Sequence, residues 1–244
     1  MTKLSVNVNK IALLRNSRGR DFPNVVNFAN KFIALGVQGI TVHPRQDERH
    51  ITMQDAYDLG DLLRDNAEVE YNIEGYPSEE FLSLVEKIKP TQCTLVPDEP
   101  GQLTSDHGWD LTQDMALVQT TCARLKKAGV RSAIFLDPEL EHVALAAQSG
   151  CNRVEFYTEA FATSFNTPRA EQVLEAYAAA VAKAIELNIE VNAGHDLDSN
   201  NLPVFLTIPG VLEVSIGHVL IVECIERGMQ PVIAQYLDIC KKSA

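Results

Sequence analysis

Hydrophobic and polar positions follow two alternating patterns along this chain. Short apolar runs rich in β-branched residues are typical of buried strands. They predict strands at residues 4–9, 39–43, 69–74, 93–97, 131–137, 153–158, 189–195 and 211–216. The segments between them carry apolar residues at helical spacing, as at Val25, Phe28, Phe32 and Leu35. This spacing predicts helices at residues 24–35, 52–64, 78–87, 112–128, 138–149, 169–187 and 201–207.

Residues at the helix ends agree with these boundaries. Thr52 and Ser78 stand where an N-cap side chain is wanted. Pro138 at the start of one helix and Gly150 at its end show the asymmetry usual for helices. A last helical region begins at Gly217-His218, and the sequence Gly228-Met229-Gln230-Pro231 should divide it into two pieces.

Strict alternation of strands and helices requires a parallel sheet. Eight such units of about 30 residues each match a closed (β/α)₈ barrel. The competing fold is an open doubly wound sheet, which would carry a glycine-rich turn after its first strand. The chain has Asn7-Val8-Asn9-Lys10 at that place. We therefore expect an α/β protein, a single TIM barrel over residues 1–244 with extra short helices in its loops.

Composition narrows the possible functions. Of the 244 residues 45% are hydrophobic and 22% are charged, as in an ordinary globular enzyme. The net charge of -12 and the lack of a Lys/Arg run argue against a nucleic-acid partner. Phosphorylated small molecules stay compatible with an acidic chain, because a few Arg residues and helix N-termini can form a local anion site.

Cysteine use and hydropathy indicate the compartment. The five Cys residues are scattered and odd in number, with no Cys-x-x-Cys pair. This pattern favours reduced thiols over a disulfide framework. The first residues contain no apolar stretch of signal-peptide type, and no run is long enough to span a bilayer. We expect a cytoplasmic protein without a membrane partner.

Polar side chains follow the predicted strands at their carboxyl ends, where barrel enzymes build their active sites. Three of the six His residues, His43, His195 and His218, stand at such ends. Each of these polar residues, taken singly, could be a satisfied core or loop residue. A chance gathering of all of them at one barrel end is improbable. The other strand-end residues are Asn7, Asn9, Lys10, Arg45, Asn72, Glu74, Asp137, Glu155, Thr158 and Asn192.

Two groups of these residues suit anions. Gly217 and His218 open a helix after the last strand, a common phosphate-binding corner of barrels, and Arg18 on the loop after the first strand could reach it. A second anion could be held across the mouth by Arg45, His50, Lys10 and Thr104. Two cationic subsites beside acid/base groups suit an enzyme that joins two phosphorylated metabolites.

Metal catalysis is the main chemical alternative. His43, His195, His218 and Glu74 are possible ligands, but the chain has no His-x-His on its first strand and no His-Glu-x-x-His. We therefore expect side-chain acid/base catalysis with no metal and no cofactor.

Several blocks are specific enough to suggest a family. They are Val6-Asn7-Val8-Asn9, Leu14-Arg15-Asn16-Ser17-Arg18-Gly19, Gly39-Ile40-Thr41-Val42-His43-Pro44-Arg45, Arg49-His50-Ile51, Asn72-Ile73-Glu74, Leu95-Val96-Pro97, Asn192-Ala193-Gly194-His195 and Ile216-Gly217-His218. In these blocks and their order, over nearly its whole length, the chain resembles pyridoxine 5′-phosphate synthases.

The resemblance implies a homo-octamer of TIM barrels in vitamin B6 biosynthesis. Such an enzyme joins 3-amino-2-oxopropyl phosphate to 1-deoxy-D-xylulose 5-phosphate, giving pyridoxine 5′-phosphate, phosphate and water. By position, His43 and Glu74 match the family's proton acceptors and His195 its proton donor. Residues matching the amino-ketone phosphate site are Asn7, Arg18, Asp196, Gly217 and His218. Residues matching the pentulose phosphate site are Asn9, Lys10, Arg45, His50 and Thr104.

Two positions depart from the familiar family pattern. Well-known members carry Asp-His where this chain has Asn9-Lys10, and Gly where it has Asp196. The first change alters the charge of a substrate subsite, and the second places a carboxylate near a phosphate. The loop at residues 98–110, with Gly101 and Gly108 as hinges, could close over the mouth. Two alternative functions stay open. The chain could be another barrel lyase or aldolase that acts on phosphorylated metabolites, or a binding barrel without catalytic activity.

Overall fold

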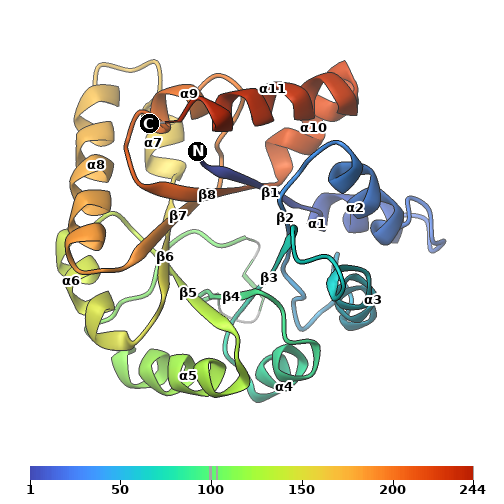
Figure 1. Cartoon of the computed structure of the whole chain (residues 1–244), viewed down its shortest axis with the longest axis horizontal. Coiled ribbons are helices and arrows are strands. Elements are labelled where there is room, and N and C mark those ends of the chain that lie inside the picture. Colours follow the sequence, from blue (N-terminus) through green and yellow to red (C-terminus); the bar gives the residue numbers. More distant parts are fainter. Residues whose placement is uncertain (99–100, 103, 244) are drawn as a thin grey trace.

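The computed structural model describes residues 1–98, 101–102 and 104–243. Eight parallel strands close into a barrel in sequence order, with β8 paired to β1 (Figure 1). This closure confirms the predicted (β/α)₈ architecture. The strands are β1 (Lys3–Asn7), β2 (Gly39–Val42), β3 (Glu70–Gly75), β4 (Gln92–Leu95), β5 (Arg131–Leu136), β6 (Arg153–Tyr157), β7 (Glu190–Gly194) and β8 (Val211–Ile216).

Helices surround the barrel, as Figure 1 shows. Within the described ranges, no helix has the length and apolar character needed to cross a membrane. The helices are α1 (Asn9–Asn16), α2 (Val25–Ala34), α3 (Met53–Leu63), α4 (Glu79–Ile88), α5 (Met115–Ala128), α6 (Leu140–Ser149), α7 (Glu159–Ser164), α8 (Ala170–Glu186), α9 (Leu202–Phe205), α10 (His218–Arg227) and α11 (Met229–Lys241).

Most of the predicted helix ends are found, including Gly150 as the C-cap of α6, but α6 begins at Leu140 with Glu139 as its N-cap, so Pro138 precedes the helix and does not open it. The Thr52 side chain accepts a hydrogen bond from the backbone N–H of Asp55, whose own side chain completes a capping box on α3. Ser78 caps α4 in the same way through the N–H of Phe81. The last helical region is divided into α10 and α11 at Gly228, where φ is +91°. These three predictions are confirmed.

The first βα connection differs from its prediction. The strand ends at Asn7, two residues earlier than expected, and α1 begins at Asn9, the last residue of the predicted strand, and continues through a stretch predicted to be loop. Val8 looks like a continuation of the strand pattern, but the backbone turns there and α1 buries Ile11 and Ala12 against the barrel. The short α7, which follows β6 directly, was also not located in the sequence.

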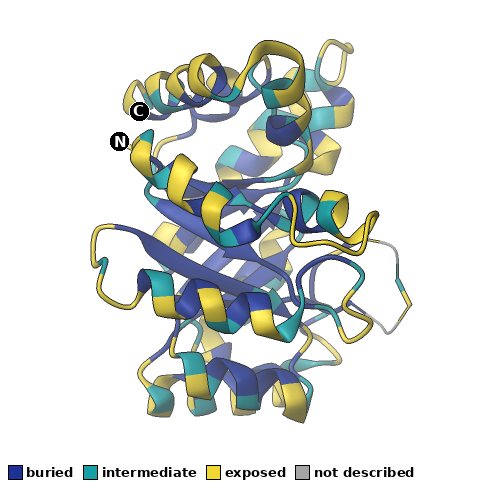
Figure 2. Cartoon of the chain, turned by 90° about the vertical axis from the view of Figure 1, so that its right-hand side faces the viewer, coloured by how far each residue is buried: buried dark blue, intermediate teal, exposed yellow. Residues whose placement is uncertain are grey.

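The hydrophobic core lies between the strands and the helices. Figure 2 shows buried strands through the middle of the molecule, with exposed residues concentrated on the outer helix faces. Leu4, Ile40, Ile73 and Val154 are fully buried members of this layer. Because side chains alternate across a strand, every second residue points instead to the barrel axis.

The barrel interior is polar. Side chains there are joined across neighbouring strands by hydrogen bonds: Ser5 Oγ lies 2.7 Å from Thr41 Oγ1, and Thr94 Oγ1 donates to Asn72 Oδ1 at 3.0 Å. Barrels are more often filled by branched apolar side chains. The amino-terminal end is occupied by ion pairs, in which the buried Glu70 carboxylate contacts Lys3 and Arg131. Polar side chains therefore fill much of the barrel interior beneath the mouth, beside a small apolar cluster of Val96, Phe135 and Tyr157.

Candidate active site

A cavity of about 470 Å³ opens at the carboxyl ends of the strands. It brings together twelve of the thirteen predicted site residues, from the first strand to the last. These are Asn7, Asn9, Lys10, His43, Arg45, His50, Glu74, Thr104, His195, Asp196, Gly217 and His218. Arg18 is the thirteenth: it is exposed on the turn after α1 and is not part of the cavity lining.

Asparagine side chains connect β1 to β2 at the cavity floor. Asn7 Oδ1 accepts a hydrogen bond from the backbone N–H of Asn9 at 3.0 Å. Asn9 Oδ1 in turn accepts from the N–H of His43 at 3.0 Å. Asn7 Nδ2 also donates to Glu74 Oε2 at 3.4 Å. These contacts fix the turn after β1 and hold His43 and Glu74 toward the same space.

His43 lies between two carboxylates and is only 6% exposed. Its Nδ1 is 3.9 Å from Glu74 Oε2, and its Nε2 is 3.9 Å from Asp98 Oδ2. Burial, followed by the charge of Arg45, lowers the pKa of His43 well below 6.5. The imidazole is therefore neutral at physiological pH and can accept a proton.

Two carboxyl groups line the cavity, the buried Glu155 and the partly buried Glu74. Burial and the charge of Glu155 raise the pKa of Glu74 well above 4.5. Burial, with the charge of Glu213, raises the pKa of Glu155 to about 8. A Cβ at Gly194 would lie 2.5 Å from Glu155 Oε1, so glycine leaves the space that this carboxyl group occupies. Carboxyl groups of this kind can take up and return protons near neutral pH.

Cationic groups stand on the side of the cavity formed after β2. Arg45 is paired with the buried Asp98 carboxylate, which also accepts a hydrogen bond from Ser105 Oγ at 2.8 Å. His50 Nδ1 accepts from the N–H of Ile51 at 2.9 Å. Burial and the charges of Arg45 and Lys10 lower the pKa of His50 to about 4. The positive charge here therefore comes from Arg45, Arg49 and Lys10.

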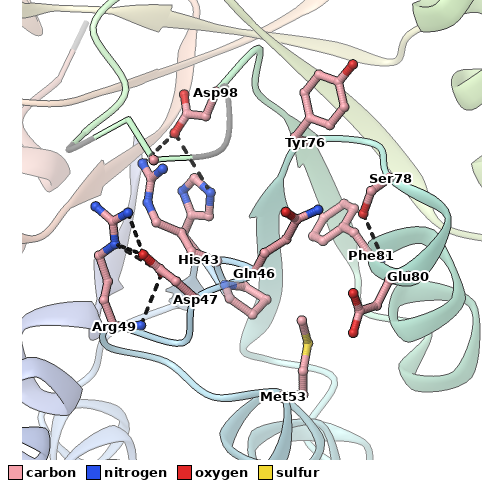
Figure 3. Close-up of a pocket in the computed structure, with 13 residues that line it drawn as sticks. His43, Gln46, Asp47, Arg49, Met53, Tyr76, Ser78, Glu80, Phe81 and Asp98 are labelled. Carbon is pink, nitrogen blue, oxygen red and sulfur yellow. Dashed lines mark hydrogen bonds and ion pairs between the residues drawn. The ribbon is translucent and has the colours of Figure 1, made fainter.

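A smaller hollow of about 140 Å³ adjoins this side (Figure 3). His43, Arg45 and Arg49 line both spaces. In Figure 3 the Asp98 carboxylate lies close to the His43 ring, while Asp47 is held by Arg49, whose Nε donates to Asp47 Oδ2 at 2.8 Å. The residues of the β2 loop thus separate the main cavity from a shallow outer space.

His195 lies just past the end of β7. Its Nδ1 is 2.8 Å from Asp196 Oδ2, and its Nε2 is 3.3 Å from Thr104 Oγ1. The ring packs edge-on against Tyr157, with centroids 4.9 Å apart. His195 and Asp196 both have positive φ, +81° and +58°. This unusual backbone turns both side chains out of the strand direction and onto the cavity.

The start of α10 forms the corner between β8 and β1. Gly217, His218 and Val219 line the cavity, so the free backbone N–H groups of the first turn of α10 lie at its edge. Glycine at position 217 lets the chain after β8 pass close to β1, because a Cβ there would lie only 3.0 Å from the Cβ of Asn7. Helix N-termini favour anions through these N–H groups and the helix dipole.

Three further charged residues belong to this site but were not among the predicted site residues: Arg49, which lines the cavity beside Arg45, Glu155 and Asp98. Glu155 lies on the inward face of β6, and the sequence signal for it was its position two residues before the strand end. Asp98 follows β4 and orients Arg45. The predicted lid loop includes residues 99, 100 and 103, which lie outside the described residues. Gly108 is packed against the backbone of Leu136 and Asp137, so it anchors the loop to β5.

Barrel and cavity together define an α/β-barrel protein whose cavity, at the carboxyl ends of the strands, gathers His, Glu, Arg and Lys side chains. Among the described residues, no group of three or more His, Cys, Asp or Glu side chains is arranged to hold a metal ion. Sequence comparison agrees with this class and makes it specific. The chain belongs to the family of the pyridoxal phosphate biosynthesis protein PdxJ, whose sequence model matches residues 4–242.

Curated relatives support the same assignment. The chain is 48% identical over 237 residues to pyridoxine 5′-phosphate synthase of Bacteroides thetaiotaomicron, covering 97% of this chain and 98% of the relative. It is 46% identical over 242 residues to pyridoxine 5′-phosphate synthase of Christiangramia forsetii, covering 99% and 100%. The predicted resemblance to this family is therefore confirmed.

Solved structures of distant proteins share the fold. The tryptophan synthase α-subunit of Pyrococcus furiosus is 12% identical, with a TM-score of 0.67 and 97% of each chain covered. The 3-hexulose-6-phosphate synthase of Salmonella typhimurium is 10% identical, with a TM-score of 0.65 and 99% of each chain covered. At this identity the likeness supports the barrel fold alone.

Proposed function

We propose that this chain is a pyridoxine 5′-phosphate synthase. It condenses 3-amino-2-oxopropyl phosphate with 1-deoxy-D-xylulose 5-phosphate and releases phosphate and water. One observation carries the proposal: in a member of this family, the neutral His43, Glu74 with its raised pKa, and His195 line one cavity together with residues suited to bind two anions. Condensation, dehydration and ring closure all move protons, and these groups can supply and accept them.

In the proposed mechanism, His43 and Glu74 accept protons and His195 donates one. The low pKa of His43 supports an accepting role, because the imidazole is unprotonated when substrate arrives. The raised pKa of Glu74 supports a group that returns the proton later in the cycle. Glu155, 3.2 Å from Thr94 Oγ1, adds a second carboxyl group below the reacting centre.

The two substrates are proposed to occupy opposite ends of the cavity. The phosphate of the amino ketone would bind at the start of α10, through Gly217 and His218, the backbone N–H of Asp196, Asn7 and Arg18. The phosphate of the pentulose would bind near Arg45 and His50, with Asn9, Lys10 and Thr104. Holding both substrates in one cavity removes much of the entropic barrier to a bimolecular condensation.

We further propose that residues 1–244 act as one catalytic unit in the cytoplasm and assemble as a homo-octamer. Exposed apolar side chains on neighbouring helices support self-association: Leu13 and Leu14 lie on α1, and Val222 and Ile225 on α10. Light scattering of the purified protein should give eight times the mass of one chain. A monomeric mass would contradict the octamer without affecting the proposed reaction.

Turnover of the purified protein with both substrates tests the activity. Phosphate and pyridoxine 5′-phosphate should form together, and only when both substrates are present. His43→Ala and Glu74→Ala should lower kcat by about 10² to 10⁴, the usual contribution of one general acid or base. Glu175→Ala, at an exposed carboxylate on α8, is the control and should match the unchanged protein.

Other outcomes would change the assignment. Release of phosphate from one substrate alone would indicate a different barrel lyase or aldolase. Tight binding of the substrates without turnover would indicate a binding barrel. A variant that keeps its kcat and raises only KM would move that residue from proton transfer to substrate binding.

A further inference from the structure

Asp196 and His195 form a pair that is held by its surroundings. The carboxylate of Asp196 lies 2.8 Å from His195 Nδ1. Asn201 Nδ2 donates to the backbone oxygen of Asp196 at 3.1 Å, and the Thr158 hydroxyl donates to the backbone oxygen of His195. These two bonds hold both residues in the left-handed backbone conformation that brings their side chains together. The pair is therefore a built feature of the β7 loop.

The protonation of the pair follows from its contacts. The hydrogen bond from His195 lowers the pKa of Asp196, so its carboxyl group is ionised at neutral pH. An ionised carboxylate only accepts hydrogen bonds. His195 Nδ1 must therefore carry a hydrogen and donate it to Asp196, which leaves Nε2 directed at Thr104 Oγ1, 3.3 Å away, and at the cavity.

We propose that Asp196 is a positioning residue that holds His195 in the Nδ1–H form and supports its action as the proton donor at Nε2. The inference rests on the proposed function and deepens it. It assigns the Asp196 side chain a task separate from any contact that its backbone N–H makes with a substrate phosphate. A carboxylate that fixes the tautomer and orientation of a working imidazole is a general device of enzyme sites.

The proton movement balances without any further reactant. In its donating form His195 is an imidazolium with hydrogens on both nitrogens, and the carboxylate of Asp196 stabilises that charge. The Nε2 hydrogen passes to a substrate oxygen, and the N–H bonding electrons stay on Nε2. His195 is then neutral, with its remaining hydrogen on Nδ1 and still bonded to Asp196. Water or substrate reprotonates Nε2 in the next cycle.

Two substitutions separate this role from a structural one. Asp196→Gly removes the carboxylate, and Asp196→Asn keeps its size while removing its charge. Glycine and asparagine both tolerate a φ of +58°, so neither change should disturb the fold. Glu159→Gln is the matched control, because the Glu159 carboxylate accepts its hydrogen bond from the Tyr157 hydroxyl, on the ring that packs against His195.

Magic-angle-spinning ¹⁵N NMR of histidine-labelled protein reports the tautomer directly, with the His195 signals assigned by their loss in His195→Gln. At pH 8.5 the unchanged protein and Glu159→Gln should show the Nδ1–H form. Asp196→Gly and Asp196→Asn should show the Nε2–H form or a mixture. The Nδ1–H form persisting in both Asp196 variants would overturn the proposal.

Steady-state kinetics supply the second readout. Asp196→Gly and Asp196→Asn should lower kcat by about 10- to 100-fold, the usual effect of losing such a supporting contact. The KM for each substrate should change by less than about threefold. An unchanged kcat, or a change confined to the KM of the amino ketone, would overturn the proposal and make Asp196 a substrate contact. If the unchanged protein has no synthase activity, the proposed function fails, while the NMR result still decides whether Asp196 sets the tautomer.

Discussion

The carboxyl group of Glu213 makes the stability of this barrel depend on pH. Glu213 lies on β8 with its side chain inside the barrel, is 2% exposed, and accepts a hydrogen bond from Asn192 Nδ2 at 3.2 Å. Burial, with a smaller contribution from the charge of Glu70, raises its pKa from 4.5 to about 7. Between these two pH values the folded chain therefore holds a proton that the unfolded chain has released.

The sign and size of the effect follow from that proton. Where the folded state binds more protons, stability falls as pH rises. The contribution of Glu213 is fully present below pH 4.5 and is lost as pH rises through about 7. The loss amounts to about 3 kcal/mol, since each pKa step of one is about 1.4 kcal/mol. A glutamine amide in this place does not titrate and keeps an acceptor for Asn192, so Glu213→Gln should gain about that much over the unchanged protein between pH 4.5 and 8.5.

Urea unfolding at a series of pH values measures this difference. Trp109 is the single tryptophan and is buried, so its fluorescence reports the loss of structure. Protein concentration is held constant, because self-association would add stability by mass action. The lowered pKa values of His43 and His50 act in the opposite direction, so the comparison uses the difference between variant and unchanged protein.

A surface substitution controls for nonspecific charge effects. Glu175→Gln removes an exposed carboxylate on α8 and should leave the pH dependence of unfolding as it is in the unchanged protein. The reasoning is refuted if Glu213→Gln shows the same change of unfolding free energy with pH as the unchanged protein. It is also refuted if the variant gains its stability at pH 4.5 and loses it at pH 8.5.

Two further predictions concern the cavity. Lys10→Ala should raise KM for the pentulose phosphate with little change for the amino ketone, because Lys10 is near enough to His50 for its charge to lower the pKa of that imidazole. Unchanged KM values for both substrates would show that Lys10 does not bind substrate. A raised KM for the amino ketone alone would reverse the two proposed phosphate sites. Extensive chelator treatment should leave turnover unchanged, since acid/base side chains are proposed to carry the chemistry. Activity lost to chelator and restored by zinc or manganese would contradict this.

Local sequence determined most of the secondary structure. The spacing of apolar residues along a strand or helix reflects which of its faces is buried. This spacing can be recognised within a single segment of sequence. The boundaries of β8 agree with the sequence prediction, and those of α3, α8 and β6 agree within a residue or two. Because all eight strands run parallel, their carboxyl ends must meet, so a list of strand-end residues was enough to assemble most of the cavity.

Tertiary contacts decided the features that the sequence pattern misjudged. Val8 continues the apolar alternation of β1, yet the chain turns there, where Asn7 Oδ1 accepts from the N–H of Asn9 and Asn9 Oδ1 accepts from the N–H of His43. The position of Arg18 depends on the course of α1, which the sequence pattern did not reveal. The turn at Val8 depends on His43, a partner more than thirty residues away in the sequence. The position of Arg18 depends on a turn that has no strong local signal.

The protonation states inside the barrel and in its cavity belong wholly to the tertiary structure. Glu74, Glu155 and Glu213 come from three strands, and their pKa values rise because closure of the barrel removes them from water and brings their charges together. His195 and Asp196 are adjacent in the sequence, but adjacent side chains normally point apart in extended chain. Their contact needs two consecutive left-handed residues held by Thr158 and Asn201. The sequence thus determined which groups reach the mouth, whereas burial and backbone geometry decided which of them carry protons.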